Sequence, residues 1–153
     1  MKVAIGCDPN AVDFKTQLIP YLESLGYEVC DFGSDDPIYA NVAIRVGEVV
    51  ASKEYDRGIL ICGTGIGVSI TANKVPGVYA ALVTDIYQAQ RAVLSNNANI
   101  ITMGSQVIGI ELAKCLIKEF LRLTFDPNSR SAVKLARLME YEKEKLAWQM
   151  GIE

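Results

Sequence analysis

The chain has 153 residues, of which 22 % are charged, and none of them is histidine. A length of about 150 residues is usual for one domain, so we expect residues 1–153 to form a single domain. The formal net charge of −3 argues against a nucleic-acid binder, because phosphate backbones favour a basic face. Without histidine, the chain can form neither a Ser-His-Asp nor a Cys-His pair, and it offers no imidazole metal ligand. Proton transfer would therefore fall to Cys, Asp, Glu, Lys or Tyr, or to a partner chain.

The four cysteines, Cys7, Cys30, Cys62 and Cys115, show no CxxC spacing, which argues against a zinc ribbon and a thioredoxin-like motif. Cys30 and Cys115 fall on regular elements, where we expect buried core positions. No basic-then-apolar leader opens the chain, and no apolar run reaches the roughly 20 residues that span a bilayer. The sequence therefore predicts a reduced, soluble, cytoplasmic protein that does not contact membranes.

Short apolar runs alternate with amphipathic stretches along the chain. The apolar runs predict strands at residues 2–7, 27–32, 57–62, 78–83 and 99–103. Helical spacing follows at residues 14–25, 42–50, 68–74, 85–94, 110–123 and about 127–148. This alternation predicts right-handed βαβ units and a three-layer, Rossmann-like α/β fold around a five-stranded parallel sheet. The C-terminal helix, in about residues 127–153, either docks on a partner subunit or closes its own domain.

The strongest local signal is the segment Cys62-Gly63-Thr64-Gly65-Ile66-Gly67-Val68-Ser69. It follows a predicted strand, and open parallel sheets bind ligands at the carboxyl ends of their strands. Glycines let backbone N–H groups approach a ligand, and N–H groups at a helix N-terminus bind anions. The spacing fits neither a dinucleotide loop nor a phosphate loop, so it indicates an anion or oxyanion site, or a tight turn that binds nothing. Such N–H groups would favour the thiolate of Cys62 and make it a base or nucleophile.

Three further features each allow two interpretations. Asp8, at the end of the first strand, either accepts hydrogen bonds from substrate hydroxyls or caps the first helix. Asn96, before the fifth strand, either binds polyol hydroxyls or serves a turn. Arg130, Lys134 and Arg137 share one face of the predicted last helix, where they either bind a phosphate or pair with nearby glutamates.

Residues 58–70 and 72–77 read Gly-Ile-Leu-Ile-Cys-Gly-Thr-Gly-Ile-Gly-Val-Ser-Ile and Ala-Asn-Lys-Val-Pro-Gly. They resemble the signature of the ribose-5-phosphate isomerase B and galactose-6-phosphate isomerase family. Residues 3–8, 26–29 and 99–109 also fit, and the resemblance extends to about residue 125. It implies a Rossmann-like fold and a homodimer or homotetramer, or else a heteromer, with sites at the subunit interface. It also implies aldose–ketose isomerisation of a phosphorylated sugar without metal or cofactor.

The resemblance also implies roles for individual residues. Cys62 would be the base that moves a proton between C1 and C2 through a cis-enediolate, and Thr64 would assist ring opening. The glycine loop would stabilise the enediolate oxygen, and basic residues near the C-terminus would hold the phosphate, often from the other subunit. The implied substrate-binding residues are Asp8, Gly63, Gly65, Gly67, Ser69 and Asn96, and the implied phosphate-binding residues are Arg130, Lys134 and Arg137.

The chain departs from this family at three places where ribose-5-phosphate isomerases carry histidine. Pro9 and Ser95 replace two of them, the second of which helps to open the sugar ring, and the segment around Arg130 lacks the third. Three readings stay open. The chain is a ribose-5-phosphate isomerase B-like enzyme with shifted specificity, such as for erythrose or erythrulose 4-phosphate, or a subunit of a heteromeric galactose-6-phosphate isomerase, or a sugar-phosphate-binding homologue without activity.

Overall fold

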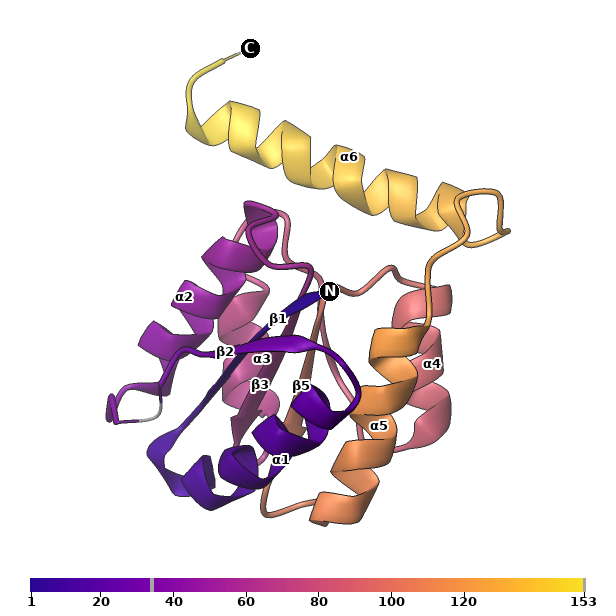
Figure 1. Ribbon diagram of the computed structural model, residues 1–153. Coiled ribbons are helices and arrows are strands. Elements are labelled where there is room, and N and C mark those ends of the chain that lie inside the picture. Colours follow the sequence, from indigo (N-terminus) through magenta and orange to yellow (C-terminus); the bar gives the residue numbers. More distant parts are fainter. Residues whose placement is uncertain (34, 153) are drawn as a thin grey trace.

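The computed structural model describes residues 1–33 and 35–152. Its strands form one parallel sheet in the order β2-β1-β3-β5-β4 (Figure 1). The strands are β1 (Lys2–Cys7), β2 (Glu28–Asp31), β3 (Arg57–Cys62), β4 (Ala80–Leu82) and β5 (Ile100–Gly104). The helices are η1 (Pro9–Ala11), α1 (Val12–Ser24), α2 (Tyr39–Ala51), α3 (Ile66–Ala72), α4 (Ile86–Leu94), α5 (Ile110–Arg122) and α6 (Ala132–Gln149).

Helices cover both faces of the sheet and complete three layers (Figure 1). Successive side chains of a strand point to opposite faces. Ile59 and Ile61 therefore enter a core shared with α1, α4 and α5, whereas Leu60 and Cys62 enter a core shared with α2 and α3. A continuous apolar run such as β3 is typical of a strand that is buried on both faces. The predicted α/β fold with a five-stranded parallel sheet is confirmed.

Most of the helices begin one to five residues away from the predicted positions, and two of these differences have a clear local cause. α3 starts at Ile66 rather than Val68, because Gly65 turns the chain in the left-handed conformation, with φ of 80°, and the helix follows at once. α6 starts at Ala132, several residues after Pro127, because Asp126 holds a turn in front of it. The Asp126 carboxylate accepts the backbone N–H of Asn128 over 2.9 Å.

α6 crosses the end of the sheet at which the strands begin (Figure 1). Glu142 ties it there, since its two carboxylate oxygens accept hydrogen bonds from the Gly77 N–H and the Tyr79 hydroxyl, each over 3.0 Å. Burial, together with the hydrogen bond to Glu142 and its charge, raises the pKa of Tyr79 to about 12. Leu135 is the one buried side chain of α6. Its exposed large apolar side chains are Val133, Leu138, Met139, Tyr141 and Trp148.

No helix in the described ranges combines the length and the apolar character that crossing a bilayer requires.

Candidate active site

Asp8 and Cys62 lie at the carboxyl ends of two neighbouring strands, β1 and β3. The chain leaves β1 toward β2 on one side of this pair and leaves β3 toward β4 on the other. The crevice between β1 and β3 is therefore a topological switch point, where open α/β sheets bind ligands. A pocket of about 480 Å³ lies there, and we call it the thiol pocket. It is lined by Asp8, Asn10, Tyr39, Cys62, Gly63, Thr64, Ile66, Gly67 and Ile70.

The thiol of Cys62 is held by the loop that follows it. Cys62 is 7 % exposed, and the backbone N–H of Gly65 donates to its Sγ over 3.0 Å. Gly65 has a positive φ of 80°, and a Cβ at that position would lie 2.5 Å from Leu82 and 2.8 Å from the backbone of Met103. Glycine is therefore required at this position by conformation and by space. The loop therefore directs a hydrogen-bond donor at the sulfur atom of Cys62.

The N–H groups of the glycine loop divide between the loop and the pocket. Those of Gly65 and Ile66 are used locally, since they donate to Cys62 Sγ and, over 3.3 Å, to Thr64 Oγ1. The N–H groups of Gly63 and Thr64 donate to no other residue in the described part of the chain. Both residues line the thiol pocket. Their N–H groups are therefore among the donors that a developing oxyanion in this pocket could use.

Asp8 caps a helix and also faces the pocket. Its carboxylate accepts the N–H of Asn10 over 2.9 Å and caps η1, the short 3₁₀ turn that leads into α1. The predicted capping role is confirmed in this form. The same side chain lines the thiol pocket, so the predicted contact with substrate hydroxyls stays compatible with the geometry.

Tyr39 lines the thiol pocket but was not found from the sequence pattern. It is the first residue of α2, and its ring lies against the glycine loop. A Cβ at Gly67 would lie 2.6 Å from Cζ of Tyr39, so the ring occupies the space that a side chain there would need. The one sequence signal for such a neighbour was Gly67, because a glycine often stands where another residue packs closely against the backbone.

Two predicted substrate-binding residues of the loop do not line the thiol pocket. Gly65 is buried, and its carbonyl accepts the Thr102 hydroxyl over 2.9 Å, which joins the loop to β5. Ser69 lies within α3, where its carbonyl accepts the Asn73 N–H over 3.1 Å. The structure places both residues where they hold the loop and α3 in position.

Asn96, Arg130 and Lys134 line a second pocket, of about 540 Å³, which we call the cationic pocket. It lies toward the opposite end of the sheet, because Asn96 precedes β5 and the start of β5 pairs with Gly58 near the start of β3. Cys62 is four residues further along β3, roughly 13 Å at the usual rise of a strand. A single chain therefore does not bring Asn96 and the two cations to the thiol pocket.

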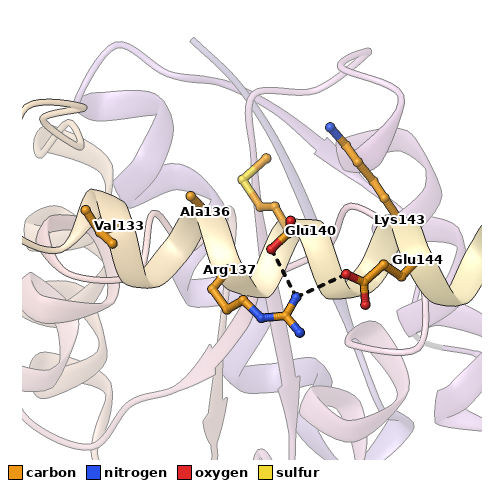
Figure 2. A pocket seen from close by; sticks show the side chains of 7 residues that line it. Val133, Ala136, Arg137, Glu140, Lys143 and Glu144 are labelled. Atoms are coloured by element: carbon orange, nitrogen blue, oxygen red, sulfur yellow. Dashed lines mark hydrogen bonds and ion pairs between the residues drawn. The ribbon is translucent and has the colours of Figure 1, made fainter.

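Arg137 lies apart from both pockets. It forms ion pairs with Glu140 over 3.2 Å and Glu144 over 3.4 Å, and these side chains line a shallow groove formed by α6 alone (Figure 2). Arg130 lies in the turn before α6, so helical spacing does not place it on one face with Arg137. The salt-bridged interpretation is confirmed for Arg137 and not for Lys134, which has no ion pair within the described ranges.

The expectation of a buried core position is wrong for Cys115, which is exposed. The buried stripe of α5 runs through Ala113, Leu116, Ile117 and Phe120, and Cys115 lies outside it. Cys30 is half-buried. Within the described residues, no group of three or more Cys, Asp or Glu side chains is arranged to hold a metal ion.

A profile of the family described as Ribose/Galactose Isomerase matches residues 3–138. D-erythrulose-4-phosphate isomerase 2 from Mycolicibacterium smegmatis is 46 % identical over 148 residues, which are 93 % of this chain and 97 % of that protein. Ribose-5-P isomerase B from Listeria innocua is 44 % identical over 147 residues, 94 % of this chain and 99 % of that protein. The structure of Clostridium thermocellum ribose-5-phosphate isomerase B matches with a TM-score of 0.89 and 40 % identity, over 95 % of this chain and 99 % of that one. The chain therefore belongs to the ribose/galactose isomerase family and is an aldose–ketose isomerase.

Proposed function

We propose that the chain interconverts the aldose and ketose forms of a four-carbon sugar phosphate, erythrose 4-phosphate and erythrulose 4-phosphate. The observation that carries the proposal is the absence of histidine, above all at Ser95, where ribose-5-phosphate isomerases of the family carry a ring-opening histidine. A tetrose whose terminal oxygen is phosphorylated cannot close the usual five-membered ring. A site without the ring-opening histidine therefore suits this substrate. The similarity to a D-erythrulose-4-phosphate isomerase supports the same substrate class.

In the proposed reaction, the Cys62 thiolate removes the proton from C2 of the aldose. The electron pair moves through the C1–C2 bond to the carbonyl oxygen, which gives a cis-enediolate. The thiol then returns a proton to C1, and the hydroxyl proton on O2 moves to O1, which leaves the ketose. The open N–H groups of Gly63 and Thr64 would stabilise the oxyanion in the intermediate.

Two polar side chains of the thiol pocket would orient the substrate. The Thr64 hydroxyl oxygen already accepts the Ile66 N–H, which leaves its own proton available to donate to a substrate oxygen. Asp8 would accept hydrogen bonds from substrate hydroxyls, since its carboxylate lines the same pocket.

We also propose that two chains form each site, so that the working unit is a dimer or a tetramer. One chain would supply the thiol pocket and its partner would supply Asn96, Arg130 and Lys134. Support comes from distance, because the two pockets of one chain are separated by roughly 13 Å of strand. A tetrose phosphate spans only about 6 Å from C1 to phosphorus, at about 1.5 Å per bond and normal bond angles.

Exposed apolar side chains support the same assembly. Ile66 and Ile70 are 51 % and 59 % exposed beside the thiol pocket, and Val133 and Trp148 are 79 % and 76 % exposed on α6. Exposed apolar surface of this kind is typical of a face that a partner subunit covers. The C-terminal helix would thus lie at the subunit interface. A cytoplasmic location would keep the catalytic thiol reduced.

The proposal is tested by assaying the purified chain alone on aldose and ketose phosphates of four, five and six carbons. The tetrose 4-phosphates are expected to have the highest kcat/KM. Activity on galactose 6-phosphate that appears only when a second, different chain is added would instead indicate a heteromeric enzyme. Turnover of none of the substrates would indicate a binding homologue.

A further inference from the structure

The cationic pocket contains a third cation that the sequence pattern did not single out. Arg91, from the last turn of α4, lines it beside Arg130 and Lys134. Among the residues that the structure describes, no acidic side chain lines this pocket. Three positive charges around one hollow of about 540 Å³ form a site for an anion.

The other arginines of the chain already have partners. Three of the six form ion pairs with carboxylates, namely Arg45, Arg122 and Arg137. Arg57 donates to two backbone carbonyls at the end of α5. Within the described residues, Arg91 and Arg130 are the two arginines with neither a carboxylate nor a carbonyl partner, and both line the cationic pocket.

Arg91 is held in place by Ser95, one helical turn further on. Its Nε donates to Ser95 Oγ over 2.7 Å. The backbone carbonyl of Arg91 accepts from the Ser95 N–H over 2.9 Å and from the side-chain amide of Asn96 over 3.2 Å. With Nε bound, the two terminal nitrogens of the guanidinium keep their hydrogens available for a two-pronged contact with an oxyanion.

We propose that Arg91 is a third ligand of the substrate phosphate and that Ser95 is its positioning residue. This inference rests on the proposed function, because it takes the anion bound in the cationic pocket to be the phosphate of a sugar. A phosphate monoester has a charge between −1.5 and −2 near neutral pH and three acceptor oxygens, so each of the three cations can contact one oxygen.

Ser95 links this site to the choice of substrate. The residue stands where ribose-5-phosphate isomerases of the family carry a histidine that helps to open the sugar ring, so one position both lacks that histidine and supplies an anchor for Arg91. A tetrose phosphate also has one hydroxyl fewer than a pentose phosphate. More of its binding energy must therefore come from the phosphate, and a third cation supplies it.

The test uses the full chain with Arg91→Met, Arg91→Gln, Arg91→Lys and Ser95→Ala variants, and with Lys118→Met as a matched control that removes an exposed cation of α5. The readouts are kcat and KM for erythrulose 4-phosphate and ribose 5-phosphate, and the inhibition constant of inorganic phosphate. Circular dichroism checks the fold. Arg91→Gln keeps a long polar side chain and gives the same information if Arg91→Met does not fold.

We expect Arg91→Met and Arg91→Gln to raise KM by about 10- to 100-fold, the range for hydrogen bonds to a charged group, and to weaken phosphate inhibition in parallel. Their kcat should change by less than about threefold, Arg91→Lys should recover part of the loss, and Lys118→Met should match the wild type. Ser95→Ala should give a smaller rise in KM.

Wild-type KM and phosphate inhibition in both neutral Arg91 variants would overturn the inference, as would a fall in kcat alone. An unchanged KM in Ser95→Ala would overturn the positioning role. The proposed function fails separately, if the wild-type chain prefers ribose 5-phosphate. In that case, a raised KM of the Arg91 variants for ribose 5-phosphate would still show that Arg91 binds phosphate.

Discussion

The backbone N–H of Gly65 points at Sγ of Cys62 across 3.0 Å, from a residue three positions further along the chain. Gly65 has a left-handed φ, and a Cβ there would meet Leu82 and the backbone of Met103, so a larger residue would disturb the loop that makes this contact. The contact places a hydrogen-bond donor on a thiol at the carboxyl end of the central strand. The first predictions concern this thiol and the loop that holds it.

Cys62→Ala removes the proposed base and should lower kcat by about 10²- to 10⁴-fold, the usual contribution of general acid–base catalysis. The side chain is small, so the free energy of unfolding should fall by only about 1 kcal/mol. The measurements are steady-state kinetics and urea denaturation. Cys115→Ala, at an exposed position of α5, is the control and should keep full activity. A Cys62→Ala enzyme with more than about a tenth of wild-type kcat would exclude Cys62 as the base.

Gly67→Ala places a methyl group 2.6 Å from Cζ of Tyr39. The ring is the far end of a side chain that can rotate, so the free energy of unfolding should fall by less than about 1 kcal/mol. The displaced ring should nevertheless narrow the thiol pocket and raise KM severalfold. The double variant with Tyr39→Ala restores the space, and a double-mutant cycle should show a coupling of about 0.5–3 kcal/mol. Additive effects of the two substitutions would contradict the contact.

Gly65→Ala should behave differently, because its methyl group would meet the backbone of Met103 at 2.8 Å and φ there is +80°. The backbone cannot move aside as the Tyr39 ring can. The free energy of unfolding should therefore fall by about 2–4 kcal/mol. Gly109→Ala is the control, since no atom lies within 4 Å of a Cβ at that position. Equal stability of the Gly65→Ala and Gly109→Ala variants in urea denaturation would contradict this account of the loop.

The raised pKa of Tyr79, which its burial and its hydrogen bond to Glu142 cause, predicts a pH dependence of stability. The pKa of Tyr79 is raised to about 12 in the folded chain, against about 10 in an unfolded chain. The folded state therefore holds this proton more tightly, so the contribution is complete below pH 10 and is lost as the pH rises from about 10 to 12. The difference in urea midpoint between the wild type and Tyr79→Phe should shrink between pH 9 and pH 11.5. A difference that stays constant over this range would argue against the raised pKa.

Shared sites predict complementation between two impaired variants, assayed at a substrate concentration well below the raised KM of Arg130→Met. A mixed dimer of Cys62→Ala and Arg130→Met chains would have one doubly altered site and one site with both native residues. Random pairing gives half mixed dimers, so refolding the two variants together should restore roughly a quarter of wild-type activity. Refolding each variant alone is the control. No gain on mixing, with subunit exchange verified by mass spectrometry, would indicate that each chain carries a complete site.

Much of the fold could be predicted from the sequence, because the spacing of apolar residues distinguishes its strands from its helices. The apolar run that became β3 was predicted with its observed ends, Arg57 and Cys62. The start of α6 was missed, since the turn held by Asp126 depends on a local hydrogen bond rather than on periodicity. That turn also places Arg130 outside the helix. Helical spacing grouped Arg130 with Arg137 only because the predicted helix included Arg130.

The parts of the candidate site that come from one continuous segment could be predicted from the sequence. The parts that distant segments contribute through packing could not. The loop after Cys62 was predicted as a site from its three closely spaced glycines. Tyr39 and Arg91 come from other elements, and packing alone brings them to their pockets. The distance between Asn96 and Cys62 follows from strand register, which the sequence of one chain does not display.

The central claim concerns the substrate, and the ratio of kcat/KM for erythrose 4-phosphate to that for ribose 5-phosphate tests it most directly. It is measured with the purified chain alone, in one buffer, and both reactions are followed from aldose to ketose. We predict a ratio above about 10, since the site lacks the ring-opening histidine but keeps its thiol and glycine loop. A ratio below one would contradict the account and would show that this site handles the cyclic pentose without histidine.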